Sequence, residues 1–250
     1  MARYALIADI HANLDALEAV VNDMDMVGYD AVICLGDVVG YGPEPARCLE
    51  LISDLADVMV LGNHDEAVLR EDVSARFNPR ARRSIEYTRS KMNEYHIALL
   101  RSMPYRAELD GFSIAHATFS PTRFEYLYTA EAAADAFNYM PAHVGLIGHT
   151  HLPSAFAAPV AQNVQAGEVT VAQLAPGQAL RYNDGRRYIL NPGSVGQPRD
   201  RNPDASWALL DSDQKRVQIR RVDYDIDAVS RKIRERGLPE QHGQRLRIGA

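Results

Sequence analysis

Several short apolar segments of this chain end in aspartate, asparagine or histidine. The clearest example is residues 58–61, an apolar run that leads directly into Gly62-Asn63-His64-Asp65. Open α/β sheets bind ligands at the carboxyl ends of their strands, so these side chains are placed for chemistry. A turn is the simpler interpretation, with Gly62 and Asn63 forming the bend and Asp65 capping a helix that begins one residue later. The recurrence of the pattern along the chain favours a site.

Hydrophobic periodicity predicts a β-then-α order at the start of the chain. Apolar runs predict strands at 4–8, 31–35, 58–61, 112–115 and 144–147. Helical spacing predicts helices from Leu14 to Gly28, at 44–55 and at 129–139. Alternating residues predict antiparallel strands between 156 and 190, then strands at 206–210 and 216–222 and a last helix around Ile226, Val229 and Ile233. Residues 191–196 are expected to form a loop, and the tail beyond Leu238 to be poorly ordered.

Length and composition favour one α/β domain over residues 1–250. With 46% hydrophobic and 24% charged residues, the chain has the composition of an ordinary globular protein, without extended disorder. Its net charge of -6 argues against a stable nucleic-acid partner, because such domains are usually basic.

The cysteines favour a reducing compartment. Cys34 falls in a predicted strand and Cys48 in a predicted helix, as expected of small buried hydrophobic residues rather than a disulfide framework. Since the two do not form a metal-type pair, any metal here must use histidine and oxygen ligands. The first residues form neither a signal peptide nor a membrane span, so the expected location is the cytoplasm, with no membrane partner.

Residues 70–106 differ in charge from the rest of the chain. They carry nine lysines and arginines against four acidic residues, a balance of +5 where the remainder of the chain carries -11. Leu99, Leu100 and Met103 indicate helices, and Asn78-Pro79 marks a break. We expect a helical cap insertion at 70–106. The simpler interpretation is a solvated helix pair that happens to be basic.

The polar strand endings together form a candidate metal site. The Asp9/His11 and His149/His151 pairs each have a spacing of two, so on extended chain both members project to the same side. A helix cap and a polar turn are the simpler interpretations of these pairs. Taken together, the endings supply seven oxygen and nitrogen donors, more than one Zn, Mn or Fe ion normally takes, so two metals fit better. The donors are Asp9, His11, Asp37, Asn63, His116, His149 and His151.

The order of these motifs strongly resembles the calcineurin-like metallophosphoesterase family. Its signatures are Asp-x-His, Gly-Asp, Gly-Asn-His-Asp/Glu, a separate His and Gly-His-x-His, and they match in family order over residues 9–151. Asn13 and the loop at 191–194 further resemble the small phosphodiesterase-like branch of bacteria and archaea. The resemblance implies an α/β fold, a four-layer sandwich of two mixed β-sheets flanked by helices.

The resemblance also implies roles for the site residues. Asp9, His11 and His151 would hold the first metal, Asn63, His116 and His149 the second, and Asp37 would bridge them. The metals would be Mn, Fe, Zn or Ni, and a metal-bound hydroxide would attack phosphorus. On an extended segment His64 points away from Asn63, so it would face the substrate and protonate or stabilise the leaving oxygen.

Two departures from the family pattern narrow the function. Ala117 replaces the usual glycine after His116, and residues 38–42 lack the Asp-Arg-Gly of phosphoprotein phosphatases, which argues against that class. Candidate substrate contacts are Asn13, Tyr41 and Arg199, for each of which a structural role is the simpler interpretation. The expected substrate is a small phosphorylated molecule, such as a nucleotide.

Four functions remain open from the sequence. A phosphodiesterase and a nucleotide or dinucleoside-polyphosphate hydrolase lead, with a phosphomonoesterase as the alternative within the enzyme class. The alternative outside it is a noncatalytic scaffold of the same fold. A scaffold need not keep all seven ligands and His64, as this chain does.

Overall fold

Two six-stranded sheets form the centre of the molecule. The computed structural model describes residues 2–250. The first sheet has the order β3 (Val58–Met59), β2 (Ala31–Cys34), β1 (Arg3–Ile7), β11 (Ala205–Asp211), β12 (Arg216–Val222) and β9 (Ala179–Arg181). The second has the order β4 (Arg106–Leu109), β5 (Phe112–Ala115), β6 (Val144–Leu146), β10 (Arg186–Pro192), β7 (Pro153–Pro159) and β8 (Thr170–Gln173).

Both sheets are mixed. In the first, β1, β2 and β3 run parallel to one another, whereas β1 pairs with β11 in the antiparallel direction. In the second, β5, β6 and β10 are parallel, and β7 returns antiparallel beside β10. Each sheet therefore has a parallel group of strands whose carboxyl ends lie at one edge, where ligands are usually bound.

The sheets pack face to face around an apolar layer. Side chains alternate along β1, so Tyr4 and Leu6 join the core between the sheets while Ala5 and Ile7 join the core beneath the helices. Burying apolar side chains on both faces is the main stabilising contribution to such a sandwich, at roughly 25 cal/mol per Å² of apolar surface.

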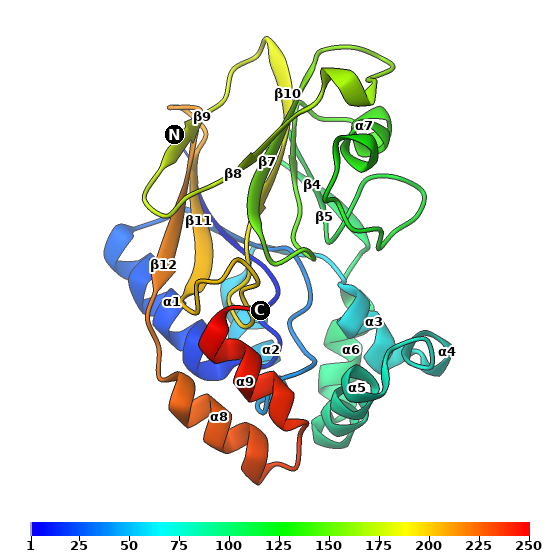
Figure 1. The fold of residues 1–250 in the computed structure, drawn as a ribbon, viewed down its shortest axis with the longest axis vertical. Coiled ribbons are helices and arrows are strands. Elements are labelled where there is room, and N and C mark those ends of the chain that lie inside the picture. Colours follow the sequence, from blue (N-terminus) through cyan, green and yellow to red (C-terminus); the bar gives the residue numbers. More distant parts are fainter. Residues whose placement is uncertain (1) are drawn as a thin grey trace.

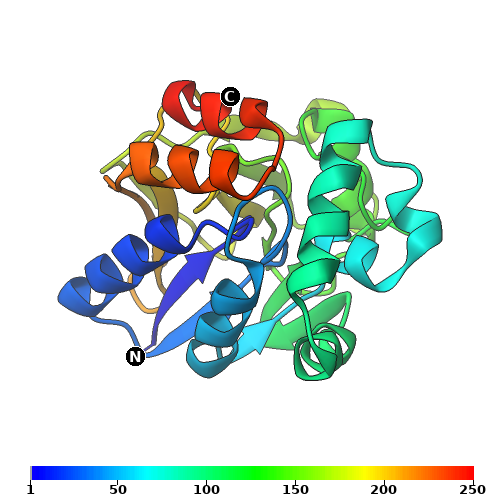
Figure 2. The ribbon, with the colours of Figure 1, turned by 90° about the horizontal axis from the view of Figure 1, so that it is seen from below.

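Helices cover the outer face of each sheet, giving four layers (Figures 1 and 2). The core of the first sheet includes residues of α1 (Leu14–Val27), α2 (Pro45–Leu55), α5 (Pro79–Lys91), α6 (Glu94–Ser102), α8 (Ile226–Glu235) and α9 (Glu240–Ile248). The second sheet is covered by α7 (Ala130–Tyr139), whose Phe137 is fully buried. The short helices are α3 (Asn63–Leu69), α4 (Glu71–Ser74) and the 3-10 turn Ala166–Glu168. No helix of residues 2–250 is long and apolar enough to cross a membrane.

The basic segment at 70–106 is helical and contains α4, α5 and α6. The expected break at Asn78-Pro79 is the start of α5, because the Asn78 side chain accepts hydrogen bonds from two backbone N–H groups and Pro79 occupies the first turn. Ile85 and Leu100 of this segment are fully buried in the core shared with α1 and α2. The single-domain boundaries and the role of this segment as a cap stay predictions.

Three local predictions were wrong. The tail beyond Leu238 forms α9, whose His242 and Leu246 are buried. Asn191 and Pro192 belong to β10 rather than to the loop that follows it. The chain is not extended at Asn63, because α3 begins there, three residues before the helix expected from the sequence.

Candidate metal centre

The parallel strands of both sheets deliver the predicted donors to one edge. Asp9 and His11 follow β1, Asp37 follows β2, and Asn63 begins the helix after β3. His116 follows β5, and His149 and His151 follow β6, so the second sheet supplies the remaining imidazoles. Six donors, all 4% exposed or less, form two buried groups, each with atoms within 4.8 Å of one another: Asp9, His11 and His151, and Asp37, His116 and His149.

The first group contains two imidazole nitrogens that face each other. His11 Nε2 lies 3.2 Å from His151 Nε2, and His151 Nε2 lies 3.4 Å from Asp9 Oδ1. The Nδ1–H of His11 donates to the Val39 carbonyl at 3.2 Å and that of His151 to the Gln197 carbonyl at 2.6 Å. In neutral imidazoles each Nε2 then carries a lone pair, so two lone pairs point at one another unless a cation lies between them.

The second group also brings two imidazole nitrogens and a carboxylate oxygen together. His116 Nε2 lies 3.1 Å from His149 Nδ1 and 3.4 Å from Asp37 Oδ2, while the Nδ1–H of His116 donates to the Leu35 carbonyl at 2.7 Å. Asp37 Oδ2 is also 3.7 Å from His11 Nε2, so this one oxygen faces both groups. A third set of close donors, His11, Asp37 and His64, overlaps the two.

Burial sets the protonation of these groups. It holds the pKa of His11 and His151 well below the usual range and lowers that of His149 to about 3, which keeps three imidazoles in the neutral form that binds metals. Burial also raises the pKa of Asp9 to about 8, and the nearby charge of Asp37 adds to this effect. For His116, Asp37 and Asp9 outweigh the opposing effect of burial and raise the pKa to about 9.

The buried polar atoms of the site fit a pair of cations. Asp9 Oδ1, Asn63 Oδ1 and His149 Nε2 are buried without a hydrogen-bond partner, which is costly in a protein interior. Facing lone pairs and unpaired carboxylate and amide oxygens are what an ion with nitrogen and oxygen ligands would satisfy.

The backbone at these strand ends adopts an uncommon conformation. Asp9, His11, Asp37, His149 and His151 all have positive φ, between 49° and 67°. Such residues cluster at functional sites, where surrounding contacts hold a conformation that costs about 1–3 kcal/mol each. Here, two backbone hydrogen bonds join the turn after β1 to the turn after β2. The Asp9 N–H donates to the Gly36 carbonyl and the His11 N–H to the Asp37 carbonyl, both at 3.0 Å.

His64 and Asp65 connect α3 to the same turns. The His64 N–H donates to Asp37 Oδ1 at 2.8 Å, and Asp65 accepts from the backbone N–H groups of Gly62 at 3.0 Å and Val39 at 3.1 Å. Asp65 therefore caps α3, as the turn interpretation expected, but for a helix that begins at Asn63.

The three candidate substrate contacts differ in their surroundings. Both ends of the Asn13 amide are engaged within the protein, with the Ala16 N–H at 3.2 Å and the Gly196 carbonyl at 3.0 Å. Tyr41 packs its ring 4.6 Å from that of His11. Arg199 donates to Gln197 Oε1 at 3.2 Å and keeps a buried Nε without a partner.

Comparison with known proteins agrees with this arrangement. The model of the calcineurin-like phosphoesterase superfamily domain matches residues 3–215, a stretch that contains all seven predicted donors. The chain belongs to this superfamily. Its fold and its enzyme class, a metal-dependent phosphoesterase, follow from that membership, and the predictions of both are confirmed. Superfamily members depend on a dinuclear metal centre, and this phosphoesterase has clustered His and Asp groups that could bind one.

Close relatives extend the likeness over the whole chain. An uncharacterised protein of Methanocaldococcus jannaschii is 35% identical over 98% of this chain and 97% of its own length. The crystal structure of a metallophosphoesterase from Sphaerobacter thermophilus is 37% identical, with a TM-score of 0.87, and the match covers 100% of this chain and 99% of that one. A hypothetical protein of Pyrococcus horikoshii, 19% identical with a TM-score of 0.75 and the same coverage of both chains, shares the fold.

Three residues around the metal centre of this phosphoesterase were missed in the sequence. Tyr126 stacks on His149 with ring centres 4.1 Å apart, and Tyr128 stacks on Tyr126 at 5.2 Å. Both tyrosines lie in a loop without regular structure, where no periodicity could signal them. Arg245 lies on α9, in the tail expected to be poorly ordered, and it is close enough to Arg199 for that charge to add to burial in lowering its pKa.

Proposed function

We propose that this protein is a dinuclear-metal phosphodiesterase that acts on small organic phosphates such as nucleotides. In this proposal Asp9, His11 and His151 hold one cation, His116 and His149 with Asn63 hold the other, and Asp37 lies between them. The observation that carries the proposal is the pair of facing imidazole nitrogens, 3.2 Å apart in one group and 3.1 Å apart in the other. Each contact is what two ligands of one cation would make, and Asp37 Oδ2 lies near both.

Mn, Fe, Zn and Ni all suit these ligands. Two bound divalent ions of this kind would neutralise phosphate charge and lower the pKa of a bound water molecule. The protein tunes this site through its ligand charges. A bound cation would displace the proton of Asp9, so Asp9 and Asp37 would contribute -2, while Asn63 contributes a neutral amide where a carboxylate would repel the phosphate. At 4 Å and an effective dielectric near 20, that repulsion would cost about 4 kcal/mol.

His64 is placed to act on the leaving group. Burial lowers the pKa of its imidazole to about 4, so the ring is neutral at pH 7. A neutral imidazole donates one N–H, which stabilises a developing oxyanion through a hydrogen bond. His64 Nδ1 is buried and unpaired, and the ring packs 4.4 Å from Tyr41, so its orientation is set by packing.

The surroundings of the site favour diesters over monoesters. Tyr126 and Tyr128 are 45% and 48% exposed although they stack beside His149, so their rings can contact an organic group. A monoester carries one organic group, which must leave, whereas a diester carries a second one that such a surface would bind. Stacking of a base on an aromatic ring contributes about 1–3 kcal/mol, which favours a nucleoside ester.

The test measures metal content and hydrolysis together. The purified protein is loaded with Mn, Fe, Zn or Ni, analysed for bound metal, and assayed with bis(p-nitrophenyl) phosphate and p-nitrophenyl phosphate. We expect about two ions per chain and a higher kcat/KM for the diester. A higher kcat/KM for the monoester would support a phosphomonoesterase. Failure to hydrolyse either ester, with two ions bound, would support a noncatalytic scaffold.

A further inference from the structure

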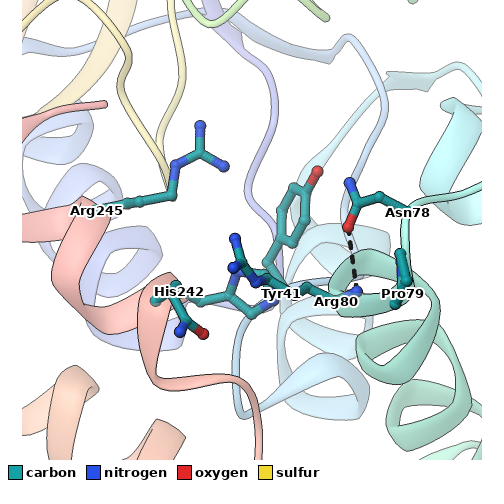
Figure 3. A pocket seen from close by; sticks show the side chains of 7 residues that line it. Tyr41, Asn78, Pro79, Arg80, His242 and Arg245 are labelled. Atoms are coloured by element: carbon teal, nitrogen blue, oxygen red, sulfur yellow. Dashed lines mark hydrogen bonds between the residues drawn. The ribbon is translucent and has the colours of Figure 1, made fainter.

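A basic pocket lies between α5 and α9 (Figure 3). It has a volume of about 480 Å³, within the range of small-molecule sites. Its walls include Tyr41, Asn78, Arg80, His242 and Arg245, and none of the seven predicted metal donors lines it. In the view of Figure 3, Arg245 and Asn78 lie on opposite sides of the Tyr41 ring. The pocket is therefore a separate chamber that shares one wall with the metal centre.

The arginines of this pocket have no carboxylate side chain as a partner. Within residues 2–250, neither Arg80 nor Arg245 forms an ion pair with a carboxylate side chain, and no acidic residue lines the pocket. By contrast, Arg82 on α5 pairs with Glu86 at 3.1 Å. Arg245 does donate its Nε to the Ala250 carbonyl at 2.5 Å, which leaves the two terminal nitrogens of its guanidinium for another acceptor.

His242 lines the pocket as a neutral ring rather than as a third positive charge. Burial, together with the charges of Arg245 and other neighbours, lowers the pKa of His242 to about 4. Its Nε2 lies 3.0 Å from Ser84 Oγ, which fixes the ring within the protein. The two guanidinium groups are thus the charged groups that line the pocket.

Tyr41 joins the two chambers. Its ring centre is 4.6 Å from that of His11 and 4.4 Å from that of His64 on the metal side, and 4.9 Å from that of His242 on the pocket side. The ring centres of His11 and His242 can therefore be no farther apart than the His11–Tyr41 and Tyr41–His242 ring spacings added together. The pocket and the metal centre therefore lie within the length of one small molecule of each other.

We propose that this pocket binds a second phosphoryl group of the substrate, so that the preferred substrates are phosphate esters with another phosphate on the part that lies beyond Tyr41. Guanidinium groups bind phosphate oxygens in a bidentate manner, and two of them without carboxylate partners favour a multiply charged anion. The inference rests on the proposed function, because it assigns the scissile phosphate to the metal centre. The basic segment at 70–106 contributes to this pocket through Arg80.

Other arginines of α5 have different surroundings. Arg89 donates to the carbonyls of Ala67 at 2.5 Å and Val68 at 2.9 Å, which makes it part of the packing between α3 and α5. Arg83 lines an adjoining hollow near Leu238, which shares Arg80 with the first pocket and also contains Glu240. Of the arginines of α5, Arg80 is the one that lines the pocket beside Tyr41.

The experiment compares two substrates that differ by one phosphoryl group. These are the p-nitrophenyl ester of thymidine 5′-phosphate and the same ester with an added 3′-phosphate, assayed on the Mn-loaded full chain. The variants are Arg245→Gln and Arg80→Gln. Their controls are Arg247→Gln on α9 and Arg82→Gln on α5, each of which removes an arginine that is paired with a carboxylate. We expect Arg245→Gln to lower kcat/KM for the 3′-phosphorylated ester about ten-fold more than for the other ester.

Salt and direct binding provide two further measurements. The preference for the second phosphate should weaken between 0.01 M and 0.15 M salt, where the screening length falls from ~30 Å to ~8 Å. Calorimetry with thymidine 3′,5′-bisphosphate and thymidine 5′-phosphate measures the same preference without turnover. Melting curves exclude variants that fail to fold, and Arg80→Gln changes an exposed side chain that has little effect on packing.

The outcomes separate the two proposals. An equal loss for both esters in the Arg245 and Arg80 variants, or an equal affinity of the parent protein for both nucleotides, overturns the pocket assignment. A parent protein that hydrolyses neither ester overturns the proposed function, while calorimetry still decides whether the pocket binds the second phosphate. A similar loss with a 3′-carboxymethyl analogue would show a site for anions in general and would overturn the assignment to phosphate.

Discussion

Asp37 occupies the centre of the donor set. Its Oδ2 lies 3.7 Å from His11 Nε2 and 3.4 Å from His116 Nε2, and its Oδ1 accepts from the His64 N–H. We predict that the Asp37→Asn variant loses more than about 100-fold in activity and binds less of both metals. The loss should exceed that caused by a change at His11 or His116. Residues that only hydrogen-bond to a metal ligand already contribute about 10–100-fold, so a ligand shared by both metals should contribute more. Elemental analysis and single-turnover assays measure this. Normal metal content and turnover would show that Asp37 does not bridge.

His64 allows a test of leaving-group stabilisation. We predict that His64→Ala keeps both metals but slows hydrolysis by about 10²- to 10⁴-fold for alkyl leaving groups and by less for nitrophenyl, which needs little stabilisation. His64→Gln should recover part of the loss for alkyl esters, because an amide still donates a hydrogen bond. Rates with a series of leaving groups measure the difference. If both classes of ester slow equally, His64 acts in positioning instead.

At the level of single residues, the sequence indicates the candidate metal donors but not the groups that hydrogen-bond to them or pack against them. Spacing and strand ends are visible in the sequence and paired Asp9 with His11 and His149 with His151, whereas the grouping of His151 with Asp9 came from the family resemblance. The hydrogen bond from His151 to the Gln197 carbonyl could not be predicted, since it joins residues 46 positions apart through backbone whose direction depends on the fold. The same holds for Tyr126, which reaches His149 from an irregular loop.

The loop after β10 connects the two sheets at the metal centre. The Gly196 N–H donates to the Asp9 carbonyl at 3.0 Å, and Ser194 Oγ donates to the same oxygen at 2.8 Å. At the end of β10 itself, Asn191 Nδ2 donates to the Gly148 carbonyl at 2.6 Å and supports the turn before His149. The sequence marked these residues as a loop, and the structure shows that they support the turns that carry donors.

Gly196 provides a test of this support. A Cβ at this position would lie 1.8 Å from the Ile10 carbonyl oxygen, a backbone atom that cannot move alone. We predict that Gly196→Ala lowers the free energy of unfolding by roughly 3 kcal/mol and reduces metal retention, because the turn between Asp9 and His11 must shift. Gly167→Ala is the control, since a Cβ there would contact nothing within 4 Å. Equal melting temperatures and metal content in the two variants would contradict the prediction.

At the level of elements, most strands and long helices were predictable. The spacing of apolar residues made α1, α2 and α7 predictable. Glu240–Ile248 contains few apolar residues, and its His242 and Leu246 are buried only because the helix packs against α8. The start of α3 was also obscured, because Gly62 ends the apolar run while the helix already begins at Asn63. Tertiary contacts, rather than local propensity, decide both cases.

Across the whole molecule, the metal centre joins the two sheets. The first sheet carries Asp9, His11 and Asp37, and the second carries His116 and His149, so bound ions would add links between the two sheets. We predict that a chelator lowers the melting temperature and that Mn or Zn restores it. At a free metal concentration of 100 times Kd, binding stabilises the fold by about 2.7 kcal/mol. Calorimetry of the parent and of Asp37→Asn tests this, and a chelator effect of the same size in both would indicate binding elsewhere.

The position of β1 governs when the fold can form during synthesis. β1 is paired on one side with β2, which follows it closely, and on the other with β11, which the ribosome makes about two hundred residues later. The hydrogen bond from Ser194 Oγ to the Asp9 carbonyl can also form only after Ser194 has been synthesised. A nascent chain that already contains every metal donor therefore has an open edge on β1, where another strand could pair. Folding of this protein is expected to be largely post-translational and to benefit from chaperones that protect that edge.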